Sequence, residues 1–501
     1  MQKIKKILIV NRGEIAVRII AACKELGIRS ATIYSEADKT SLHARLSDET
    51  YLIGPAPAVE SYLNIEKIIN LAKKINADAI HPGYGFLSEN AEFIKAVEEA
   101  GIIFIGPSSQ SVELMGSKTA ARRLMESNNV PIVPGTTEKL SDVEDAIATA
   151  KKIGFPVMLK ASAGGGGKGM RLVYSESELP EALERAQNES LKAFGSPDIY
   201  MEKFIENPKH IEVQILGDKF GNYIHLFERE CSIQRRHQKV VEEAPSVFVD
   251  GEVRRKITEA AINAARACNY YNAGTIEFLM DKDHNFYFLE MNTRLQVEHP
   301  VTELITGVDL VKEQINIAEG NELSFRQRDI KMHGHAIECR VYAEDIENNF
   351  APSTGKIKFH ELPAGPGVRV DRGIDSESEV PIYYDPLLSK VIAWGSTRTE
   401  AIERMKRALE EYIIVGVTTN IELFDWILNH KVFLEGTFDN NFLDKEFLPL
   451  VKDGKYKNGK YEKLKELAAI ATALIESGKQ NKLIADVKHN GQNNWLLGKY
   501  E

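Results

Sequence analysis

The stretch Lys160-Ala-Ser-Ala-Gly-Gly-Gly-Gly-Lys-Gly-Met-Arg171 joins two short apolar segments, Phe155–Leu159 and Met170–Tyr174, which both have the composition of strands. The glycines therefore lie at a strand-to-strand turn, whereas the P-loop and the dinucleotide-binding fingerprint both open a helix. Such a turn leaves backbone N–H groups bare, so it can close over an anion. With Lys160 and Lys168 beside the glycines, the stretch predicts a mobile flap over the phosphates of a nucleotide. A plain flexible surface turn is the alternative.

Length and composition are those of a globular protein with two to four domains, because 501 residues are too many for one core. The net charge of -10 argues against a nucleic-acid partner. The four cysteines are far apart and form no C-x-x-C pair, which argues against zinc and disulfide frameworks and favours a reducing compartment. The sequence shows no signal peptide and no membrane-spanning apolar run, so we expect a cytoplasmic protein without a membrane partner.

The first part of the chain alternates strands and helices. Residues 6–10 read as a buried strand, Ile15–Leu26 has helical apolar spacing that ends at Gly27, and Ser30–Tyr34 reads as the next strand. This alternation is typical of an open, mostly parallel α/β sheet. The glycine-rich loop His81–Ser88 follows a strand, where such sheets bind ligands, although a plain turn is an equal alternative.

The rest of the chain predicts a core with a lid and a strand-rich third part. Val130–Gly135 reads as a linker into a lid that carries the glycine flap, and the strand Ile199–Ile205 leaves the lid. A third part begins near Met332. Beyond about residue 450 the composition turns to Lys, Asn and Gly, with a helical apolar face over residues 461–477. The predicted boundaries are 1–114 for an N-terminal open-sheet domain, 115–330 for the core with its lid at about 133–203, 331–450 for a C-terminal α+β cap, and 451–501 for a tail of unknown role.

Two carboxylates are predicted to face each other on a hairpin. Thr275–Met280 and Asn285–Asn292 read as its strands, and if Lys282 pairs with Asn285 the register places Glu277 opposite Glu290. Like charges in this position are destabilising, so a hard divalent cation between them is the natural reason for the pair. Period two adds the oxygen of Asn292 to the same face, and magnesium fits because substrate phosphates complete its octahedron. The alternative is two solvent-facing glutamates on an edge hairpin.

Two further polar clusters suit anion binding. Arg294, Gln296 and Glu298 alternate, so in an extended segment they share one face with Asn292. They can form a structural ion pair, or they can hold a small anion and act on its proton. The segment Glu230–Lys239 is polar, basic and histidine-bearing, which suits phosphate or carboxylate binding, but it would be unremarkable as a solvated loop.

Several motifs together carry a resemblance to a known family. They are Asn11-Arg-Gly-Glu-Ile-Ala, His81-Pro-Gly-Tyr-Gly-Phe-Leu-Ser-Glu-Asn, the glycine flap, Glu230-Cys-Ser-Ile-Gln-Arg-Arg-His-Gln-Lys, Glu290-Met-Asn-Thr-Arg-Leu-Gln-Val-Glu-His, and Glu338-Cys-Arg-Val-Tyr-Ala-Glu. From about residue 4 to about residue 446 the chain resembles biotin carboxylase, the ATP-grasp component of biotin-dependent carboxylases. The resemblance implies a pre-ATP-grasp domain, an ATP-grasp core and the C-terminal cap. It also implies a ligase that converts ATP, bicarbonate and carrier-bound biotin into ADP, phosphate and carboxybiotin.

The resemblance also implies a role for each site residue. The residues implied to bind ATP are Lys118, Lys160, Gly166, Gly167, Glu202, Lys203, Ile205, His210, Gln234 and His237, with Glu202 to Ile205 lining the adenine pocket. Glu277, Glu290 and Asn292 would hold magnesium or manganese. Lys239, Arg294, Gln296 and Val297 would hold bicarbonate. Glu298 would deprotonate it, and Arg340 would stabilise the enolate-like ureido anion of biotin. Ala163 and Lys168 depart from the usual flap pattern and put the kinetics of lid closure in doubt.

The implied partners lie on other chains. The sequence has no Ala-Met-Lys-Met carrier motif and no room for a carboxyltransferase domain, so we expect separate carrier and carboxyltransferase subunits and a homodimer or higher oligomer. The extra tail weakly favours a role in pyruvate carboxylase over one in acetyl-CoA carboxylase. Another ATP-grasp ligase is an alternative that the set Arg294, Glu298 and Arg340 argues against. A non-catalytic nucleotide-binding regulatory protein is a second alternative, and the intact pair Glu277 and Glu290 argues against it.

Overall fold

The computed structural model describes residues 3–136, 138–162, 170–456 and 470. The chain divides into two compact units, Met1–Glu446 and Phe447–Glu501. Within the second unit the described part contains the short helix α15 (Leu448–Lys452), and the ring of Phe447 lies edge-on to that of Tyr456. The apolar face predicted over residues 461–477 falls outside the described residues. In the described part, no helix is both long enough and apolar enough to span a bilayer.

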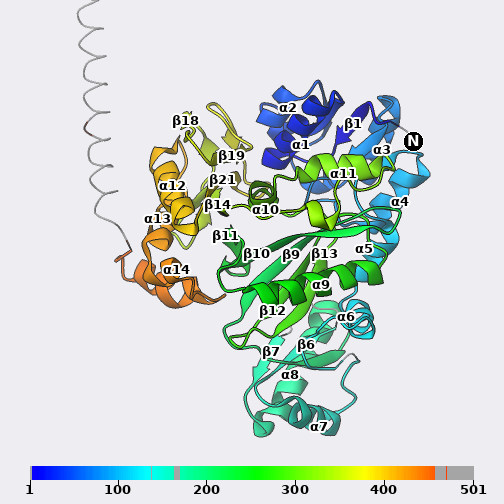
Figure 1. Cartoon of the computed structure of the whole chain (residues 1–501), viewed down its shortest axis with the longest axis vertical. Helices are drawn as coiled ribbons and strands as arrows, with labels where there is room; N and C mark the ends of the chain where they lie inside the picture. Colours follow the sequence, from blue (N-terminus) through cyan, green and yellow to red (C-terminus); the bar gives the residue numbers. More distant parts are fainter. Residues whose placement is uncertain (1–2, 137, 163–169, 457–469, 471–501) are drawn as a thin grey trace, which may run out of the picture. The chain divides into compact units, whose positions relative to one another are not determined.

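The N-terminal part of the first unit is the open parallel sheet that the sequence predicts. Its strands run in the order β3-β2-β1-β4-β5, all parallel, with helices around them (Figure 1). The bounds are β1 (Lys6–Ile9), β2 (Arg29–Ser35), β3 (Glu49–Gly54), β4 (Ala79–His81), β5 (Ile103–Phe104), α1 (Gly13–Leu26), α2 (Leu42–Leu46), α3 (Ile65–Lys74) and α4 (Ala91–Glu99). Helix α1 ends as predicted, because Gly27 adopts a left-handed φ of 69° and its N–H bonds the carbonyls of Cys23 and Lys24.

An eight-stranded antiparallel sheet forms the centre of this unit. Its order is β13-β12-β9-β10-β11-β14-β21-β19. The bounds are β9 (Lys209–Gly217), β10 (Tyr223–Arg235), β11 (Gln238–Ala244), β12 (Asn272–Met280), β13 (Phe286–Asn292), β14 (His335–Tyr342), β19 (Val368–Arg372) and β21 (Leu387–Gly395). The ladder between β11 and β14 carries the sheet across residue 330, so strands on both sides of that point in the sequence share one set of hydrogen bonds.

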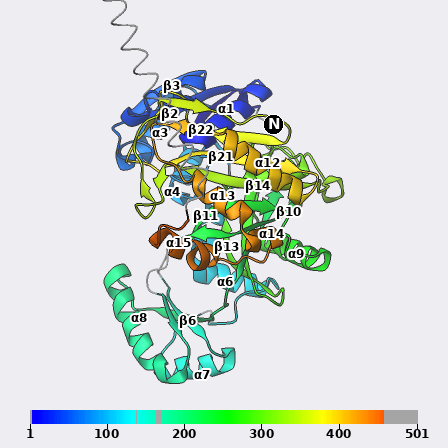
Figure 2. The same cartoon turned by 90° about the vertical axis from the view of Figure 1, so that its left-hand side faces the viewer.

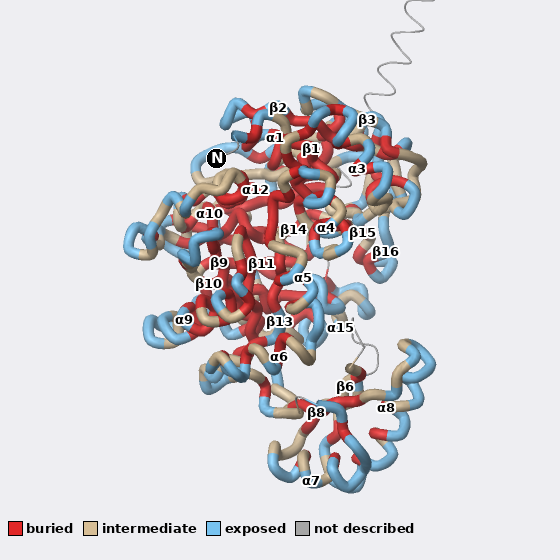
Figure 3. Tube along the Cα trace, turned by 90° about the vertical axis from the view of Figure 1, so that its right-hand side faces the viewer, coloured by how far each residue is buried: buried red, intermediate tan, exposed pale blue. Residues whose placement is uncertain are grey.

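Helices cover this sheet and leave its middle strands buried (Figure 3). α9 packs against β9 and β10, and α10 packs against β11, β14 and β21. The helices of this part are α5 (Ser109–Gly116), α6 (Lys118–Ser127), α9 (Gly251–Ala267), α10 (His299–Thr306), α11 (Leu310–Ala318), α12 (Arg398–Glu411), α13 (Ile421–Asn429) and α14 (Lys431–Glu435). Short ladders complete the C-terminal part: β15 (Glu344–Asp345) with β16 (Ala351–Pro352), β17 (Gly355–Lys356) with β20 (Glu379–Val380), and β18 (Phe359–Glu361) with β22 (Ile413–Val415). Because the middle strands of the eight-stranded sheet are buried, the charged side chains on them are removed from bulk water.

The lid is a three-stranded sheet in the order β7-β6-β8, and it stands apart from the central sheet in both views (Figures 1 and 2). Its elements are β6 (Val157–Ala161), β7 (Met170–Val173), β8 (Ile199–Lys203), α7 (Val143–Ile153) and α8 (Leu179–Phe194), which share an apolar core of their own. Because β6 and β7 pair antiparallel, the predicted strand-turn-strand arrangement around the glycines is confirmed. The tip itself, with Ala163, Gly166, Gly167 and Lys168, falls outside the described residues.

The carboxylate hairpin has the predicted facing pair, but its turn has a different register from the one assumed. Glu277 pairs with Glu290, as the sequence suggests. The assumed turn is wrong by one residue, since Asp281 donates its N–H to the carbonyl of Asn285 and Phe278 pairs with Phe288. A bulge between these pairs adds Leu289 to β13 and restores the facing register.

Candidate active site

A cleft of about 690 Å³ collects the predicted site residues. Its walls come from the lid, the central sheet and the segment after β13. The predicted residues that line it are Lys118, Lys160, Glu202, Lys203, Ile205, His210, Gln234, His237, Lys239, Glu277, Glu290, Asn292, Arg294, Gln296, Val297 and Arg340. Glu298 lies behind this wall with no exposed surface. Gly166 and Gly167 fall outside the described residues.

Glu277 is buried at the centre of a set of donors. Its Oε1 accepts hydrogen bonds from Lys239 Nζ at 2.9 Å, Asn292 Nδ2 at 2.8 Å and Gln296 Nε2 at 2.9 Å. His210 Nε2 lies 2.8 Å from its Oε2. Burial alone would raise the pKa of this carboxyl, but Lys239 and His210 outweigh burial and hold the pKa well below its usual range. Glu277 is therefore a charged carboxylate, and it is not the solvent-facing glutamate of the alternative interpretation.

Glu290 differs from its partner because it has no ion pair and no hydrogen bond within the described part of the chain. Its side chain opens toward the cleft, where loss of hydration and then the charge of Glu277 raise its pKa. Two facing carboxylates, one of them uncompensated, form a donor set that a hard divalent cation satisfies. Asn292 adds an amide oxygen that now accepts from Arg294 Nη2 at 2.8 Å. These residues therefore fit a magnesium or manganese ion.

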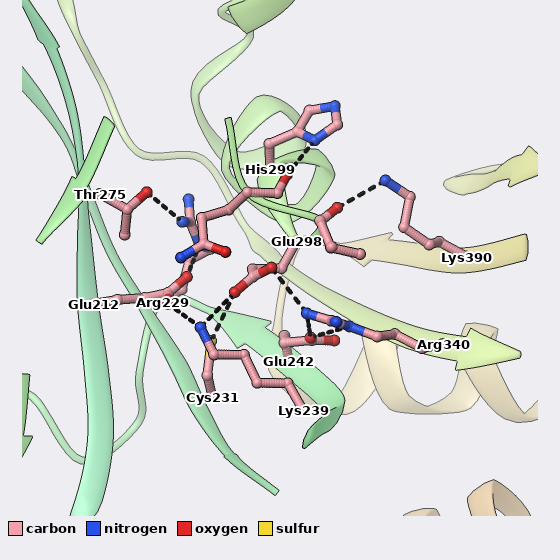
Figure 4. A network of polar contacts seen from close by, with 12 residues as sticks. Glu212, Arg229, Cys231, Lys239, Glu242, Thr275, Glu298, His299, Arg340 and Lys390 are labelled. Carbon is pink, nitrogen blue, oxygen red and sulfur yellow. Dashed lines mark hydrogen bonds and ion pairs between the residues drawn. The ribbon is translucent and has the colours of Figure 1, made fainter. Parts of the chain in front are cut away.

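A chain of alternating charges runs behind the cleft (Figure 4). Lys239 Nζ bonds Glu212 Oε2 at 2.5 Å and Glu298 Oε1 at 2.6 Å. Arg340 Nη2 bonds Glu298 Oε2 at 2.9 Å and lies 2.5 Å from Glu242 Oε1. Both oxygens of Glu298 are thus held by cations, and each cation is backed by a second buried glutamate.

This arrangement sets the chemistry of Glu298. Burial alone would raise its pKa, but Lys239, Arg340 and Arg229 outweigh that effect and hold the pKa well below its usual range. Glu298 is therefore ionised, as a general base must be, yet weak while both cations bind it. A ligand anion that draws one cation away would strengthen the base at the moment the ligand arrives.

The lid side of the cleft carries a second ion network. Arg122 and Lys160 both bind the carboxylate of Glu202, which joins α6 to the lid sheet. Lys203 donates to the carbonyls of Gly154 and Phe155 at 2.9 and 2.8 Å, so its ammonium holds lid backbone. The charged groups of Glu202 and Lys203 are therefore already bound by other groups of the protein.

His210 and His237 are positioned in different ways. His210 Nδ1 lies 3.1 Å from Gln234 Nε2, which fixes the ring beside Glu277. His237 occupies the two-residue turn between β10 and β11 with a φ of 64°. Arg236 beside it has a φ of 49°, so the turn has the left-handed backbone that twisted hairpins favour. Non-glycine residues rarely adopt this conformation, and here it holds His237 at the edge of the cleft.

Comparisons with known proteins identify the family. The biotin carboxylase N-terminal domain model matches residues 3–112, the carbamoyl-phosphate synthase L chain ATP-binding domain model matches 117–326, and the biotin carboxylase C-terminal domain model matches 338–445. Biotin carboxylase 1 of Bacillus subtilis is 51% identical over 88% of this chain and 98% of its own length. The chain belongs to the biotin carboxylase family. Like other biotin carboxylases, it is an ATP-dependent ligase of the ATP-grasp fold.

Other relatives extend the range of names within the family. A pyruvate carboxylase subunit of Methanothermobacter thermautotrophicus is 53% identical over 88% of this chain and 89% of its own. The crystal structure of a biotin carboxylase–β,γ-ATP complex from Campylobacter jejuni matches with a TM-score of 0.84 at 47% identity, over 89% of this chain and 99% of that one. The biotin carboxylase domain dimer of the Hydrogenobacter thermophilus 2-oxoglutarate carboxylase, solved with MgADP, ADP and bicarbonate, matches with a TM-score of 0.83 at 50% identity, over 91% and 100%.

A second cavity of about 470 Å³ adjoins the cleft of this biotin carboxylase family member. Both cavities are lined by Arg294, Val297, Arg340, Tyr342 and Asp385, so Arg340 stands among the residues where the two meet. The other walls of the smaller cavity come from Asn11–Ile15, Ala58, Tyr84–Phe86 and the segment 383–387. The glycine-rich loop after β4 therefore lines a cavity. From the sequence, a plain turn was an equal alternative at this position.

Sequence reasoning missed the charged residues beneath the site, namely Arg122, Glu212, Arg229 and Glu242. Arg229 has no exposed surface and donates to Glu212 Oε1 at 2.5 Å and to Gln214 Oε1 at 2.8 Å. A signal for Glu212 and Gln214 was present, because they alternate with apolar residues along one strand, which is unusual where both faces are buried. Arg122 lies on an ordinary helix pattern and gives no such signal.

Proposed function

We propose that this chain carboxylates biotin carried on a separate protein, using ATP and bicarbonate, as the first half-reaction of a multi-subunit carboxylase. The observation that carries the proposal is the position of Arg340. It binds the buried base candidate Glu298 and lines both cavities. The larger cleft, with its facing carboxylates and lysines, suits a metal-bound nucleotide, and the smaller cavity suits the ureido ring of biotin.

In the first step Glu298 takes the proton of bicarbonate, and the resulting oxyanion attacks the γ-phosphorus of ATP. The P–O bond to ADP breaks and carboxyphosphate forms. Glu277, Glu290 and Asn292 would hold the divalent ion, which neutralises charge on the transferred group. Lys118 and Lys160 lie on the same cleft and add positive charge. Arg294, Gln296, Val297 and Lys239 surround the place proposed for bicarbonate.

In the second step the C–O bond of carboxyphosphate breaks, which releases phosphate, and the carbon forms a new C–N bond with the ureido nitrogen of biotin. The released phosphate takes the proton from the ureido nitrogen, and Arg340 stabilises the negative charge that develops on the ureido oxygen. Carboxyphosphate is destroyed by water, so the lid must close over the cleft first. The ion pairs of Glu202 with Lys160 and Arg122 would hold the base of the lid to α6 during that closure.

We infer that pyruvate is the final acceptor, and that carrier and carboxyltransferase reside on other chains. The 53% identity to a protein named as part of a pyruvate carboxylase supports this inference. A relative at 52% identity is named a 2-oxoglutarate carboxylase small subunit, which makes a second 2-oxo acid the alternative to test. The dimer named in the Hydrogenobacter structure supports a homodimer.

The decisive experiment measures ATP hydrolysis by purified protein in bicarbonate-depleted buffer. We expect hydrolysis to require bicarbonate and to rise further with free biotin or a biotinylated carrier. Hydrolysis that ignores bicarbonate would make the chain a different ATP-grasp ligase, and absence of hydrolysis with intact nucleotide binding would make it a regulatory protein. The biotinylated protein that copurifies, supplied with pyruvate, 2-oxoglutarate or acetyl-CoA and labelled bicarbonate, then identifies the acceptor.

A further inference from the structure

Two buried glutamates lie directly behind Arg340 and have no part in the reaction described above. Glu242 on β11 pairs in register with Glu338 on β14, and neither side chain has any exposed surface. Glu338 precedes Arg340 by two residues, so both side chains leave the same face of β14. The cation proposed to act on biotin is therefore backed by two carboxylates.

Glu242 holds Arg340 more firmly than Glu298 does. Its Oε1 lies 2.6 Å from Arg340 Nε and 2.5 Å from Nη2, whereas Glu298 receives one bond of 2.9 Å from Nη2. Two contacts from adjacent nitrogens to one oxygen fix the plane of the guanidinium. Nη1 donates to no carboxylate in the part of the chain that the structure describes, and the hydroxyl of Tyr342 also hydrogen-bonds the Arg340 side chain.

The environment of Glu338 keeps the local charge balanced. Both of its oxygens, and Oε2 of Glu242, are buried without a hydrogen-bond partner in the described part of the chain. Two facing buried carboxylates repel each other, so one of them takes a proton. Burial raises the pKa of Glu338 well above its usual range although the charge of Lys390 opposes the shift, and burial raises the pKa of Glu242 to about 7 against the opposing charge of Arg340. Of the two carboxyls, Glu242 therefore gives up its proton first, and it is the one that Arg340 binds.

We propose that Glu242, and not the facing Glu338, is the positioning residue of Arg340. This inference rests on the proposed function. Glu242 touches no reacting atom; it acts by aiming the guanidinium where charge develops on the biotin oxygen. Because that interaction is strongest in the transition state, the loss should appear in kcat for carboxylation.

The test compares Glu242→Gln, Glu242→Asp and Glu338→Gln in the full-length protein with free biotin. In Glu242→Gln we expect kcat for biotin carboxylation to fall roughly tenfold or more, the size typical of losing a residue that orients a functional group. The KM for biotin, the KM for ATP and the bicarbonate-dependent ATPase without biotin should stay near wild-type values. Glu242→Asp keeps the charge and should recover part of kcat. Glu338→Gln imitates a neutral acid and should match wild type.

Each other outcome contradicts the inference. Equal loss of ATPase and carboxylation in Glu242→Gln, or full retention of both, would show that Glu242 does not act through Arg340. Glu242→Asp no better than Glu242→Gln, with both variants melting at the wild-type temperature, would show that its charge has no role. A defect in Glu338→Gln would show that Glu338 carries the charge. A wild-type ATPase that does not need bicarbonate would instead refute the proposed function itself.

Discussion

At the scale of single residues, the candidate site depends on which partners each charged side chain has. Glu298 is bound by two cations, whereas Glu290 has no partner in the described part of the chain. The sequence supports Glu277, Glu290 and Glu298 as candidates, because each stands in a recognisable pattern. It does not reveal that Glu212 and Glu242 back the two cations, since those contacts join strands far apart in the sequence.

Replacing Glu290 with Gln tests whether this carboxylate serves a metal. Because Glu290 has no protein partner to lose in the described part of the chain, Glu290→Gln should leave the melting temperature unchanged. The activation free energy of turnover should rise by about 2–4 kcal/mol, which is the size typical of losing one preorganised charge contact. The magnesium concentration needed for activity should also rise. Asp283→Asn, in the turn of the same hairpin and outside the cleft, is the matched control. Unchanged turnover and unchanged magnesium dependence would leave Glu290 a surface glutamate.

Arg340 and Glu298 are hydrogen-bonded to each other, but substitutions at the two positions should impair different activities. Arg340→Lys keeps a charge beside Glu242 and Glu298, yet it loses the planar fork, so carboxylation of biotin should fall by about 10²-fold while most of the bicarbonate-dependent ATPase survives. Glu298→Gln should damage both activities, because bicarbonate must be deprotonated first. Phosphate release and labelled carboxyl transfer are measured on both variants. Parallel loss in Arg340→Lys with weaker ATP binding would assign this arginine to the nucleotide.

At the scale of elements, hydrophobic periodicity predicts the strands and helices well but misses how they adjust to one another. The hairpin is a clear case, because the facing pair Glu277 and Glu290 is correct although the assumed turn is not. The bulge at Leu289 has no sequence signal, since it compensates a turn that the side chains of Asp281 and Asn285 arrange locally. The lid strands are predicted because apolar residues flank the glycines on both sides.

The linker into the lid offers a test at this scale. Gly135 forms an isolated antiparallel β-bridge with Glu202. A Cβ at Gly135 would meet the backbone carbonyl of Met201 and lie 2.9 Å from Glu202 Cα. Gly135→Ala should therefore push β8 away and loosen the contact of Glu202 with Lys160 and Arg122. We expect a several-fold rise in the KM for ATP with a small change in melting temperature. Gly251→Ala, where a Cβ meets nothing within 4 Å, is the control. An unchanged KM would exclude this strand as part of the ATP site.

At the scale of the whole molecule, one sheet assembles the site. Its adjacent strands β12, β9, β10, β11 and β14 supply Glu277, Glu212, Arg229, Lys239 and Arg340 in turn. This spatial order differs from the order in the sequence. Patterns along the chain therefore predict which residues belong to the site, but not which of them lie next to one another. The sheet also crosses residue 330, and the pairing of β11 with β14 brings Glu242 to Arg340.

The last residues of the chain lie beyond everything that the proposed reaction uses. The family models end at residue 445, and among the described residues the last one that lines the cleft is Asp444. A chain that stops after Tyr456 keeps α15 and the ring contact between Phe447 and Tyr456. We expect this truncated protein to retain the bicarbonate-dependent ATPase and the carboxylation of free biotin. Carboxylation of the copurifying biotinylated partner is measured beside them. A selective loss with that partner would give the tail a role in recognising it, whereas loss of the ATPase would contradict the assignment of the reaction to residues 1–446.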